Sequence, residues 1–231
     1  MISKNIHAIK EKIAKFAAES GRSPENIKLI AVSKRFPVTV IEEAYAGGHT
    51  LFGENYIQEV QQKRPGLPDE VKFHFIGHLQ TNKAKIAAEH CDMIETVDRL
   101  KLAVELNKHL EKLQKEMDIL VQVNIGDDPG KSGVSAEEAE SLLYELKAIP
   151  RIRVCGLMTM PPIETDPELS RPHFRGLRIL AEECSKKELF FNNNEVELSM
   201  GMSSDYHVAI EEGATIIRVG TAIFGNRPVR Q

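Results

Sequence analysis

The chain of 231 residues repeats one pattern: a short run of β-forming residues, a polar or glycine-containing turn, and a segment with helical periodicity. The expected strands cover residues 28–33, 49–53, 72–76, 93–96, 119–124, 153–158, 195–199 and 215–219. The expected helices between them cover residues 38–46, 57–63, 81–89, 99–115, 136–147, 169–187 and 205–212. This alternation predicts an α/β fold of the (β/α)8 TIM-barrel type, and a flavodoxin-like open sheet is the second choice.

A further helix is expected ahead of the first strand. Residues 2–18 combine charged side chains with apolar ones at helical spacing, which is typical of an amphipathic helix and not of a signal peptide. This extra helix can take the place of the missing eighth helix, because the chain ends soon after the last expected strand. No low-complexity or Pro/Gly-rich linker divides the chain, so residues 1–231 are expected to form a single domain.

Composition excludes several classes of function. A net charge of -4 with both signs scattered gives no support to nucleic-acid binding. No apolar stretch is long enough to span a bilayer, so no membrane partner is expected. The cysteines Cys91, Cys155 and Cys184 share no metal-ligand spacing and cannot all pair, which favours a reducing cytoplasmic location and no metal site.

Lys34 stands at the carboxyl end of the first expected strand, directly before Arg35, Phe36 and Pro37. The carboxyl ends of the strands form the working mouth of a barrel of this kind. Apolar walls around an amine disfavour its charged form and lower its pKa. A neutral amine is what an aldehyde needs to form a Schiff base. The alternative is a lysine that leaves the strand and points into water.

Two loops have the composition of a phosphate site. After the seventh expected strand come Gly201, Met202 and Ser203, and a helix follows. Ser203 is expected to cap that helix, whose N–H groups could bind an anion, and Gly201 allows close approach of the backbone. Gly220 and Thr221 follow the eighth expected strand. Each loop alone has a plain structural explanation, but these are the two places where this fold often holds phosphate.

A third glycine-containing segment, residues 126–132, suggests a nucleotide-binding loop but does not fit one. The spacing between its glycines is one residue shorter than the Walker pattern requires. Pro129 lacks an N–H donor, and two aspartates in the segment would repel phosphates. The segment is therefore expected to be a polar loop after the fifth strand.

Arg218 lies on the last expected strand, where the side chains alternate between faces. It shares one face with Ile216 and Gly220, while Ile217 and Val219 suit packing against helices. Arg218 is therefore expected to point into the barrel. An unpaired buried guanidinium is costly, so it needs a partner, either a carboxylate such as Glu197 or Asp205 or an acceptor on a ligand.

Other residues after strand ends are less specific. Asn55 is either a ligand contact or a turn former, and His78 is either a proton carrier or a structural hydrogen-bonding residue. His74 is expected to be a hydrogen-bonded core side chain. Tyr206 is expected to pack on its helix.

Taken together, five segments resemble the YggS/PROSC family of pyridoxal phosphate homeostasis proteins. They are residues 31–34, 52–55, 74–80, 198–203 and 218–225. The resemblance runs in consistent order from the first strand to the end of the chain. It implies a barrel like the amino-terminal domain of bacterial alanine racemase, with pyridoxal 5′-phosphate (PLP) as the cofactor.

The same resemblance implies a role for each candidate residue. Lys34 would hold PLP as a Schiff base, Arg218 would face the ring nitrogen and Asn55 would lie beside the ring. The phosphate contacts implied are Ser203, Gly220 and Thr221, and Met202 is counted with the cofactor-binding residues. A permanently charged arginine at the ring nitrogen discourages protonation of the ring and limits the chemistry available to the cofactor.

The family also implies a function: a cytoplasmic, monomeric carrier of PLP that acts in vitamin B6 homeostasis and amino-acid and keto-acid balance. PLP-dependent client enzymes would be its partners, and it would have no catalytic turnover. The alternative is a PLP-dependent enzyme such as an amino-acid racemase, which uses an extra domain that a chain ending at Gln231 leaves no room for. A colourless Schiff-base aldolase and a regulatory interaction protein are further alternatives.

Overall fold

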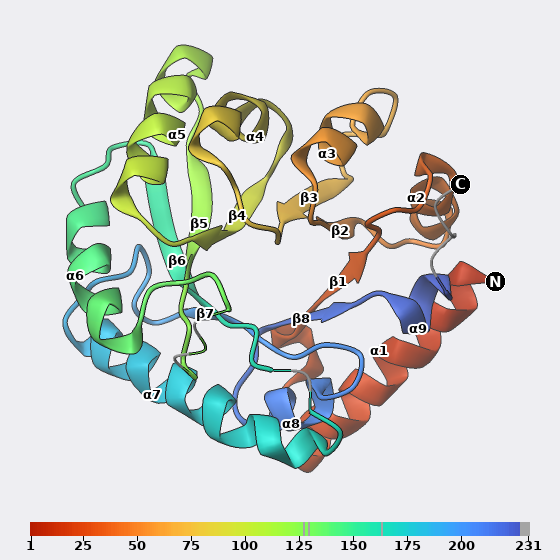
Figure 1. Cartoon of the computed structure of the whole chain (residues 1–231). Helices are drawn as coiled ribbons and strands as arrows, with labels where there is room; N and C mark the ends of the chain where they lie inside the picture. The colour runs from red at the N-terminus through yellow and green to blue at the C-terminus, as the bar shows by residue number, and fades with distance from the viewer. Residues whose placement is uncertain (127, 129, 163, 227–231) are drawn as a thin grey trace.

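A computed structural model describes residues 1–126, 128, 130–162 and 164–226. Its centre is a closed barrel of parallel strands in the order β1-β2-β3-β4-β5-β6-β7-β8, so the predicted (β/α)8 TIM barrel is confirmed (Figure 1). The strands are β1 (Lys28–Val32), β2 (Leu51–Glu54), β3 (Lys72–Phe75), β4 (Met93–Val97), β5 (Met117–Gln122), β6 (Ile152–Met158), β7 (Glu197–Ser199) and β8 (Ile216–Val219).

Helices follow the strands and form the outer layer of the barrel (Figure 1). They are α1 (Ile2–Glu19), α2 (Val38–Ala46), α3 (Ile57–Lys63), α4 (Ala84–His90), α5 (Leu100–Leu113), α6 (Ala136–Leu146), α7 (Arg171–Lys186), α8 (Tyr206–Glu211) and α9 (Thr221–Phe224). Three short 3-10 helices are η1 (Pro24–Asn26), η2 (Thr81–Lys83) and η3 (Pro167–Ser170). None of the described helices is long and apolar enough to cross a membrane.

The apolar residues form two separate clusters. The larger one lies between the strands and the helices and includes Ile217 and Val219 of β8. The smaller one fills the barrel interior with side chains from several strands, namely Ile30, Val32, Ile76, Met93, Leu120, Met158 and Ile216. Alternating strand residues supply the two clusters, as the pleat of a strand requires.

The amino-terminal helix α1 closes the outer layer. Its buried face consists of Ile2, Ile6, Ile9, Ile13 and Ala17. It packs against α2, α8 and the very short α9, which is the place that an eighth full-length helix would fill. The side chain of Asn5 on α1 also donates a hydrogen bond to the carbonyl of Ile223 on α9, at 2.8 Å. The expected replacement of the eighth helix is confirmed.

Gly156 of β6 allows the backbones of β6 and β7 to approach closely. A Cβ at this position would lie 1.9 Å from the carbonyl oxygen of Glu197, which is backbone and cannot rotate away. We therefore expect Gly156→Ala to lower the free energy of unfolding by about 2 kcal/mol or more, in the range of overpacked core sites. Urea unfolding would measure this. Gly176→Ala on α7 meets only a flexible Ile125 methyl at 3.2 Å and should change stability by less than about 1 kcal/mol.

Candidate functional site

The candidate cofactor-binding residues lie at the carboxyl ends of four consecutive strands. Lys34 follows β1, Asn55 follows β2, and the 202–203 segment follows β7, while Arg218 is on β8. Gly220 and Thr221 come directly after β8. Because β7, β8, β1 and β2 are neighbours in the closed barrel, these residues share one side of its mouth.

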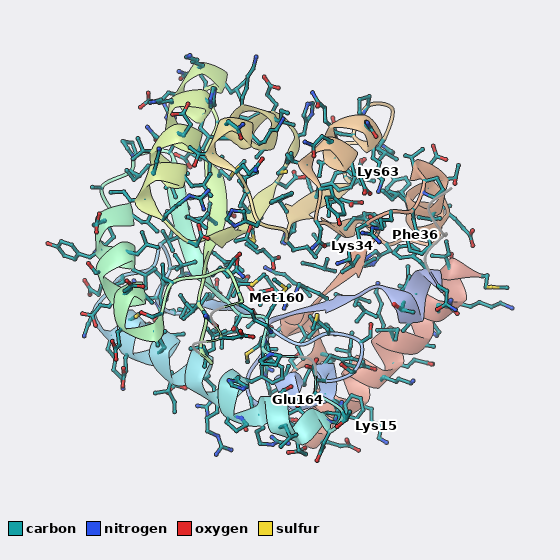
Figure 2. All side chains as sticks on the ribbon, in the orientation of Figure 1. Lys15, Lys34, Phe36, Lys63, Met160 and Glu164 are labelled. Atoms are coloured by element: carbon teal, nitrogen blue, oxygen red, sulfur yellow. The ribbon has the colours of Figure 1, made fainter. Side chains whose placement is uncertain are left out.

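Lys34 is half-buried in the turn that follows β1. Val32, two residues earlier, lies against Gly220, where a Cβ would be 3.3 Å from the Val32 carbonyl oxygen. The backbone before Lys34 and the loop after β8 are therefore in contact. Figure 2 shows Lys34 at the mouth, with Lys63 and Phe36 to one side and Met160 towards the middle of the barrel.

The loop after β7 has backbone donors available for an anion. The N–H groups of Ser203 and Ser204 form no hydrogen bond with another described residue, and the side chain of Ser203 is exposed. The loop is tied to β8 because the Arg218 N–H donates to the Gly201 carbonyl at 3.1 Å. This geometry brings the two predicted phosphate loops together.

One expectation about this loop is wrong, and a second has a sufficient explanation in packing. Helix α8 begins at Tyr206 with Asp205 as its N-cap residue, so Ser203 does not cap it. The Asp205 carboxylate instead accepts a hydrogen bond from the Met202 N–H at 2.6 Å. The turn ahead of α8 therefore continues to residue 205. Gly201 has a positive φ of 92° and its Cβ would lie 2.5 Å from the Ala209 side chain, so packing on α8 is sufficient to require glycine here.

The second phosphate loop is held from two directions. Asn5 bonds to the carbonyl of Ile223, as described above, and the ring of Phe224 lies 5.4 Å from the ring of Phe36. Phe36 is two residues after Lys34. The aromatic contact therefore links the turn that carries Lys34 to the short helix that begins at Thr221.

Arg218 is buried, with 3% of its surface exposed, and it lies on the interior face of β8 as predicted. Its guanidinium donates to the hydroxyl of Ser199 and, at 2.9 Å, to the carbonyl of Thr159. Neither of the two carboxylates considered, Glu197 and Asp205, is hydrogen-bonded to it, although Asp205 acts on it through its charge. Glu197 lies at the opposite end of the barrel, where it pairs with Lys28.

The carboxylate nearest to this arginine in the hydrogen-bond network is Glu95 of β4, which the sequence analysis did not identify. Glu95 is fully buried, accepts the Ser199 hydroxyl, and lies 2.7 Å from Nδ1 of His74. Burial alone would raise the pKa of Glu95, but the hydrogen bond and charge of His74 and the charge of Arg218 hold it below its usual value. Burial lowers the pKa of Arg218, and the charges of Glu95 and Asp205 act against this. The chain His74–Glu95–Ser199–Arg218 thus crosses the barrel interior, and the expectation that His74 is a hydrogen-bonded core residue is confirmed.

Asn55 has a buried acceptor without a partner. Its Oδ1 is buried and accepts no hydrogen bond from any described residue. Its backbone is held by Gly77, where a Cβ would lie 2.1 Å from the Asn55 carbonyl oxygen. A buried polar atom without a partner is costly, and a bound ligand that donates a hydrogen bond would remove this cost.

His78, on the neighbouring loop, is half exposed and its Nδ1 lies 3.7 Å from the Asp98 carboxylate. This favours the structural explanation for His78.

The remaining predicted loop, residues 126–132, lies after β5. Asp127 and Pro129 are outside the described residues. Of the others, the Asn124 side chain donates to the carbonyl of Asp128 at 2.9 Å, and Lys131 donates to the carbonyl of Met160 at 2.8 Å.

Behind Lys34 lies a buried cluster of charges on β2 and α3. Glu54 at the end of β2 is fully buried and accepts hydrogen bonds from Lys63 Nζ and the Ser33 hydroxyl, each at 2.7 Å. Burial raises the pKa of Glu54 to about 7, although the charge of Lys63 and both hydrogen bonds act against this. Its second oxygen, Oε2, has no partner among the described residues.

Glu54 and His49, near the two ends of β2, should affect stability in opposite directions as pH changes. Burial lowers the pKa of His49 from 6.5 to about 4, partly opposed by its hydrogen bond to the Leu51 carbonyl. Between pH 4.5 and 6.5 the unfolded chain ionises Glu54 while the folded chain keeps it neutral, so this contribution to stability falls as pH rises. In the same range His49 loses its proton in the unfolded chain, whereas in the folded chain it is already neutral. The contribution of His49 to stability therefore rises as pH rises.

Each contribution is at most about 3 kcal/mol, and in the wild-type chain they offset one another. We expect Glu54→Gln to become more stable, relative to wild type, as pH rises from 4.5 to 6.5, and His49→Gln to become less stable. Urea unfolding across this range measures both slopes. Stability curves that run parallel to that of the wild type would contradict the assignment.

The described donors and the unpartnered acceptor of Asn55 fit an aldehyde cofactor with an anionic group. One side of the mouth carries four kinds of group. They are the amine of Lys34, the backbone N–H groups of the 203–204 turn, the buried guanidinium of Arg218 and the unpartnered amide oxygen of Asn55. No group of three or more His, Cys, Asp or Glu side chains with metal-binding geometry occurs in the part of the chain that the structure describes.

Comparisons with known proteins identify the family of the chain. The family model described as alanine racemase, N-terminal domain, matches residues 5–228. The pyridoxal phosphate homeostasis protein of Aquifex aeolicus is 42% identical over 218 residues, covering 94% of each chain. That of Escherichia coli (strain K12) is 39% identical over 230 residues, covering 98% of this chain and 97% of the relative. The chain belongs to the pyridoxal phosphate homeostasis protein family.

Solved structures place this homeostasis protein family on the same scaffold. PipY of Synechococcus elongatus PCC7942, solved with PLP bound, is 33% identical with a TM-score of 0.82, covering 97% of this chain and 100% of that one. Alanine racemase of Clostridium difficile 630 shares the fold at 15% identity, with a TM-score of 0.74, and this chain covers 57% of it. The predicted resemblance and the racemase-like barrel are therefore confirmed.

Proposed function

We propose that the chain is a PLP carrier that acts in vitamin B6 homeostasis and in amino-acid and keto-acid balance. Lys34 would hold the cofactor, with the whole chain acting as one binding unit. The observation that carries the proposal is the position of Lys34 at the end of β1, next to the loop that contains Gly220. The PLP bound by PipY and the names of the curated relatives support the same ligand.

The covalent step needs only the amine of Lys34 and the cofactor aldehyde. PLP would supply the aldehyde, and the neutral amine of Lys34 would form a C=N bond with its carbon, with the carbonyl oxygen and the two amine hydrogens released as water. The balance requires no oxidant and no second substrate. Hydrolysis reverses it, as a carrier requires.

The noncovalent contacts proposed are the phosphate on Ser203, Gly220 and Thr221, beside Met202, with the ring between Asn55 and Arg218. The free N–H groups in the 203–204 turn and the unpartnered Oδ1 of Asn55 support this orientation. Arg218 is already bonded to Ser199 and Thr159, which fixes the direction of its guanidinium before any ligand arrives. A guanidinium at the ring nitrogen would withhold a proton from that nitrogen and make the ring a weak electron sink.

We further propose that the protein does not turn over amino acids. A racemase needs a second proton carrier on the opposite face of the cofactor, and the two candidates for it are otherwise engaged. Tyr206 is 7% exposed and its ring lies 6.0 Å from that of Phe16 on α1, outside the barrel. His78 lies beside Asp98.

Deuterium exchange tests this proposal against the racemase alternative. PLP-loaded protein would be incubated with single amino acids in deuterium oxide. Slow exchange, limited to about one equivalent per protein, supports the carrier. Sustained stereospecific exchange at the α-carbon would establish an enzyme.

We also propose that the protein is a cytoplasmic monomer and that it releases PLP to client enzymes. Mixing the loaded protein with the apo form of a PLP-dependent enzyme should restore that enzyme's activity while the visible absorption of the carrier decays at the same rate. A carrier that keeps its absorption while the apoenzyme stays inactive would contradict the role in homeostasis.

A further inference from the structure

The two residues that flank Lys34 are fixed by one hydrogen-bonded group, formed by the buried Lys63 and Glu54 and the partly exposed Glu59. We call these three residues the Lys63 clamp. Lys63 is the last residue of α3, and its side chain is 8% exposed. Its Nζ donates to Glu54 Oε1 and Glu59 Oε2, each at 2.7 Å, and to the carbonyl of Ser33 at 3.0 Å. All three donors of the ammonium are therefore used.

The clamp holds the chain on both sides of Lys34. On the amino-terminal side, the Ser33 hydroxyl donates to Glu54 at 2.7 Å, and the Ser33 carbonyl accepts from Lys63. On the carboxyl-terminal side, the backbone N–H of Arg35 donates to Glu59 Oε2 at 2.8 Å. The same Glu59 oxygen accepts from Lys63, so the two sides are joined through one ammonium group.

The turn that the clamp holds is strained. Arg35 has a φ of 66°, in the left-handed region that a residue with a side chain rarely adopts. Such a conformation persists only where surrounding contacts impose it. The turn is also closed by the Phe36 N–H, which donates to the Ser33 carbonyl at 3.1 Å. Loss of the bond from the Arg35 N–H to Glu59 would remove one of the two contacts that impose this φ, and a change of φ at Arg35 would alter the direction of the Lys34 side chain.

A largely buried group of titratable side chains is a poor source of stability, because the loss of hydration cancels most of the attraction within the group. Its retention directly behind Lys34 suggests a geometric role. We propose that Lys63, Glu54 and Glu59 are positioning residues that hold the amine of Lys34 where it can reach the aldehyde of the cofactor. The inference rests on the proposed attachment of PLP to Lys34 and goes beyond it by assigning the residues that set its geometry.

Two ligands distinguish a defect in the positioning of Lys34 from a general loss of ligand binding. Bond formation depends steeply on how the reacting groups are held. PLP uses both the noncovalent contacts and the bond to Lys34, whereas pyridoxine 5′-phosphate has an alcohol in place of the aldehyde and uses the noncovalent contacts alone. Loss of the clamp should weaken the binding of PLP and leave the binding of pyridoxine 5′-phosphate nearly unchanged.

The test measures the Kd of both ligands for Lys63→Met and Glu59→Ala. We expect the Kd of PLP to rise about tenfold or more in each variant, and the Kd of pyridoxine 5′-phosphate to change less than about twofold. Glu59 is partly exposed, so its variant decides the outcome if Lys63→Met does not fold. The matched control is Lys108→Met, which removes an exposed helical ion pair with Glu105 and should change neither Kd.

A second readout uses the protein without any cofactor. The Arg35 amide should lose protection from hydrogen exchange in Glu59→Ala, because its acceptor is gone. Adding Arg35→Gly to Glu59→Ala should lower the Kd of PLP again, because glycine adopts the left-handed conformation without strain.

The inference is overturned if the Kd values of both ligands rise equally, or if neither Kd changes. Failure of the proposed function looks different: wild-type protein would then bind PLP without a bond to Lys34 that borohydride can reduce to a stable amine. A normal bond at Lys34 in every clamp variant, with unchanged affinity, would contradict the clamp and leave the carrier function intact.

Discussion

Lys34→Ala is expected to purify as a folded protein that has lost the visible absorption of bound PLP. The reason is that Lys34 supplies the amine for the covalent bond, while the phosphate loops remain in place. The affinity for PLP should fall about a hundredfold or more, equivalent to roughly 2.7 kcal/mol. Lys34 is half-buried in a turn, so the free energy of unfolding should change by less than about 1 kcal/mol. Absorption spectra, PLP titration and urea unfolding measure the three quantities.

Lys28→Ala is the matched control, because Lys28 opens the same strand at the opposite end of the barrel and pairs there with Glu197. It should keep full visible absorption. Retention of full absorption by Lys34→Ala itself would remove Lys34 from the site.

Arg218→Ala should have the second largest effect, because it acts on stability and on the cofactor together. The substitution leaves Glu95 and the Ser199 hydroxyl buried without the positive charge that they now face. Removing one partner from a buried network typically costs about 3 kcal/mol or more. It should also change the visible spectrum of bound PLP and its pH dependence more than Asn55→Ala does, because Arg218 carries a charge and Asn55 does not.

Arg153→Ala provides the control for this prediction. Arg153 forms a partly exposed ion pair with Asp118 at 2.6 Å near the first residues of β5 and β6, and its loss should lower stability by at most about 1 kcal/mol. Equal stability losses for the two arginine variants would contradict the buried network. Spectral effects that are equal for Arg218→Ala and Asn55→Ala would remove Arg218 from the ring.

Most of the fold follows from hydrophobic periodicity. The apolar strands and the amphipathic face of α1 recur at the right intervals, so strand order and the role of α1 were predictable. The errors are at the ends of elements. The seventh strand begins at Glu197 and not at residue 195. Helix α8 begins at Tyr206 and not at residue 205, because the Asp205 carboxylate accepts the Met202 N–H and holds a turn ahead of the helix. Such local hydrogen bonds leave no periodic signal.

The binding residues at the mouth could be located, but not the residues that support them. Glu95 lies between Ile94 and Thr96 in an otherwise apolar strand, and that position is the signal that could have identified it. Lys63 and Glu59 have the spacing of an ordinary helical surface pair, so the sequence gives no reason to expect a buried clamp. The hydrogen bonds from Lys63, at the end of α3, to Glu54 of β2 and to the Ser33 carbonyl after β1 make it one.

The most direct test of the central claim is to map the site of covalent attachment. PLP-loaded protein would be reduced with borohydride, digested, and examined by mass spectrometry. The account predicts about one reduced adduct per chain, located on Lys34. An adduct on another lysine, or label spread over surface lysines with Lys34 unmodified, would contradict it.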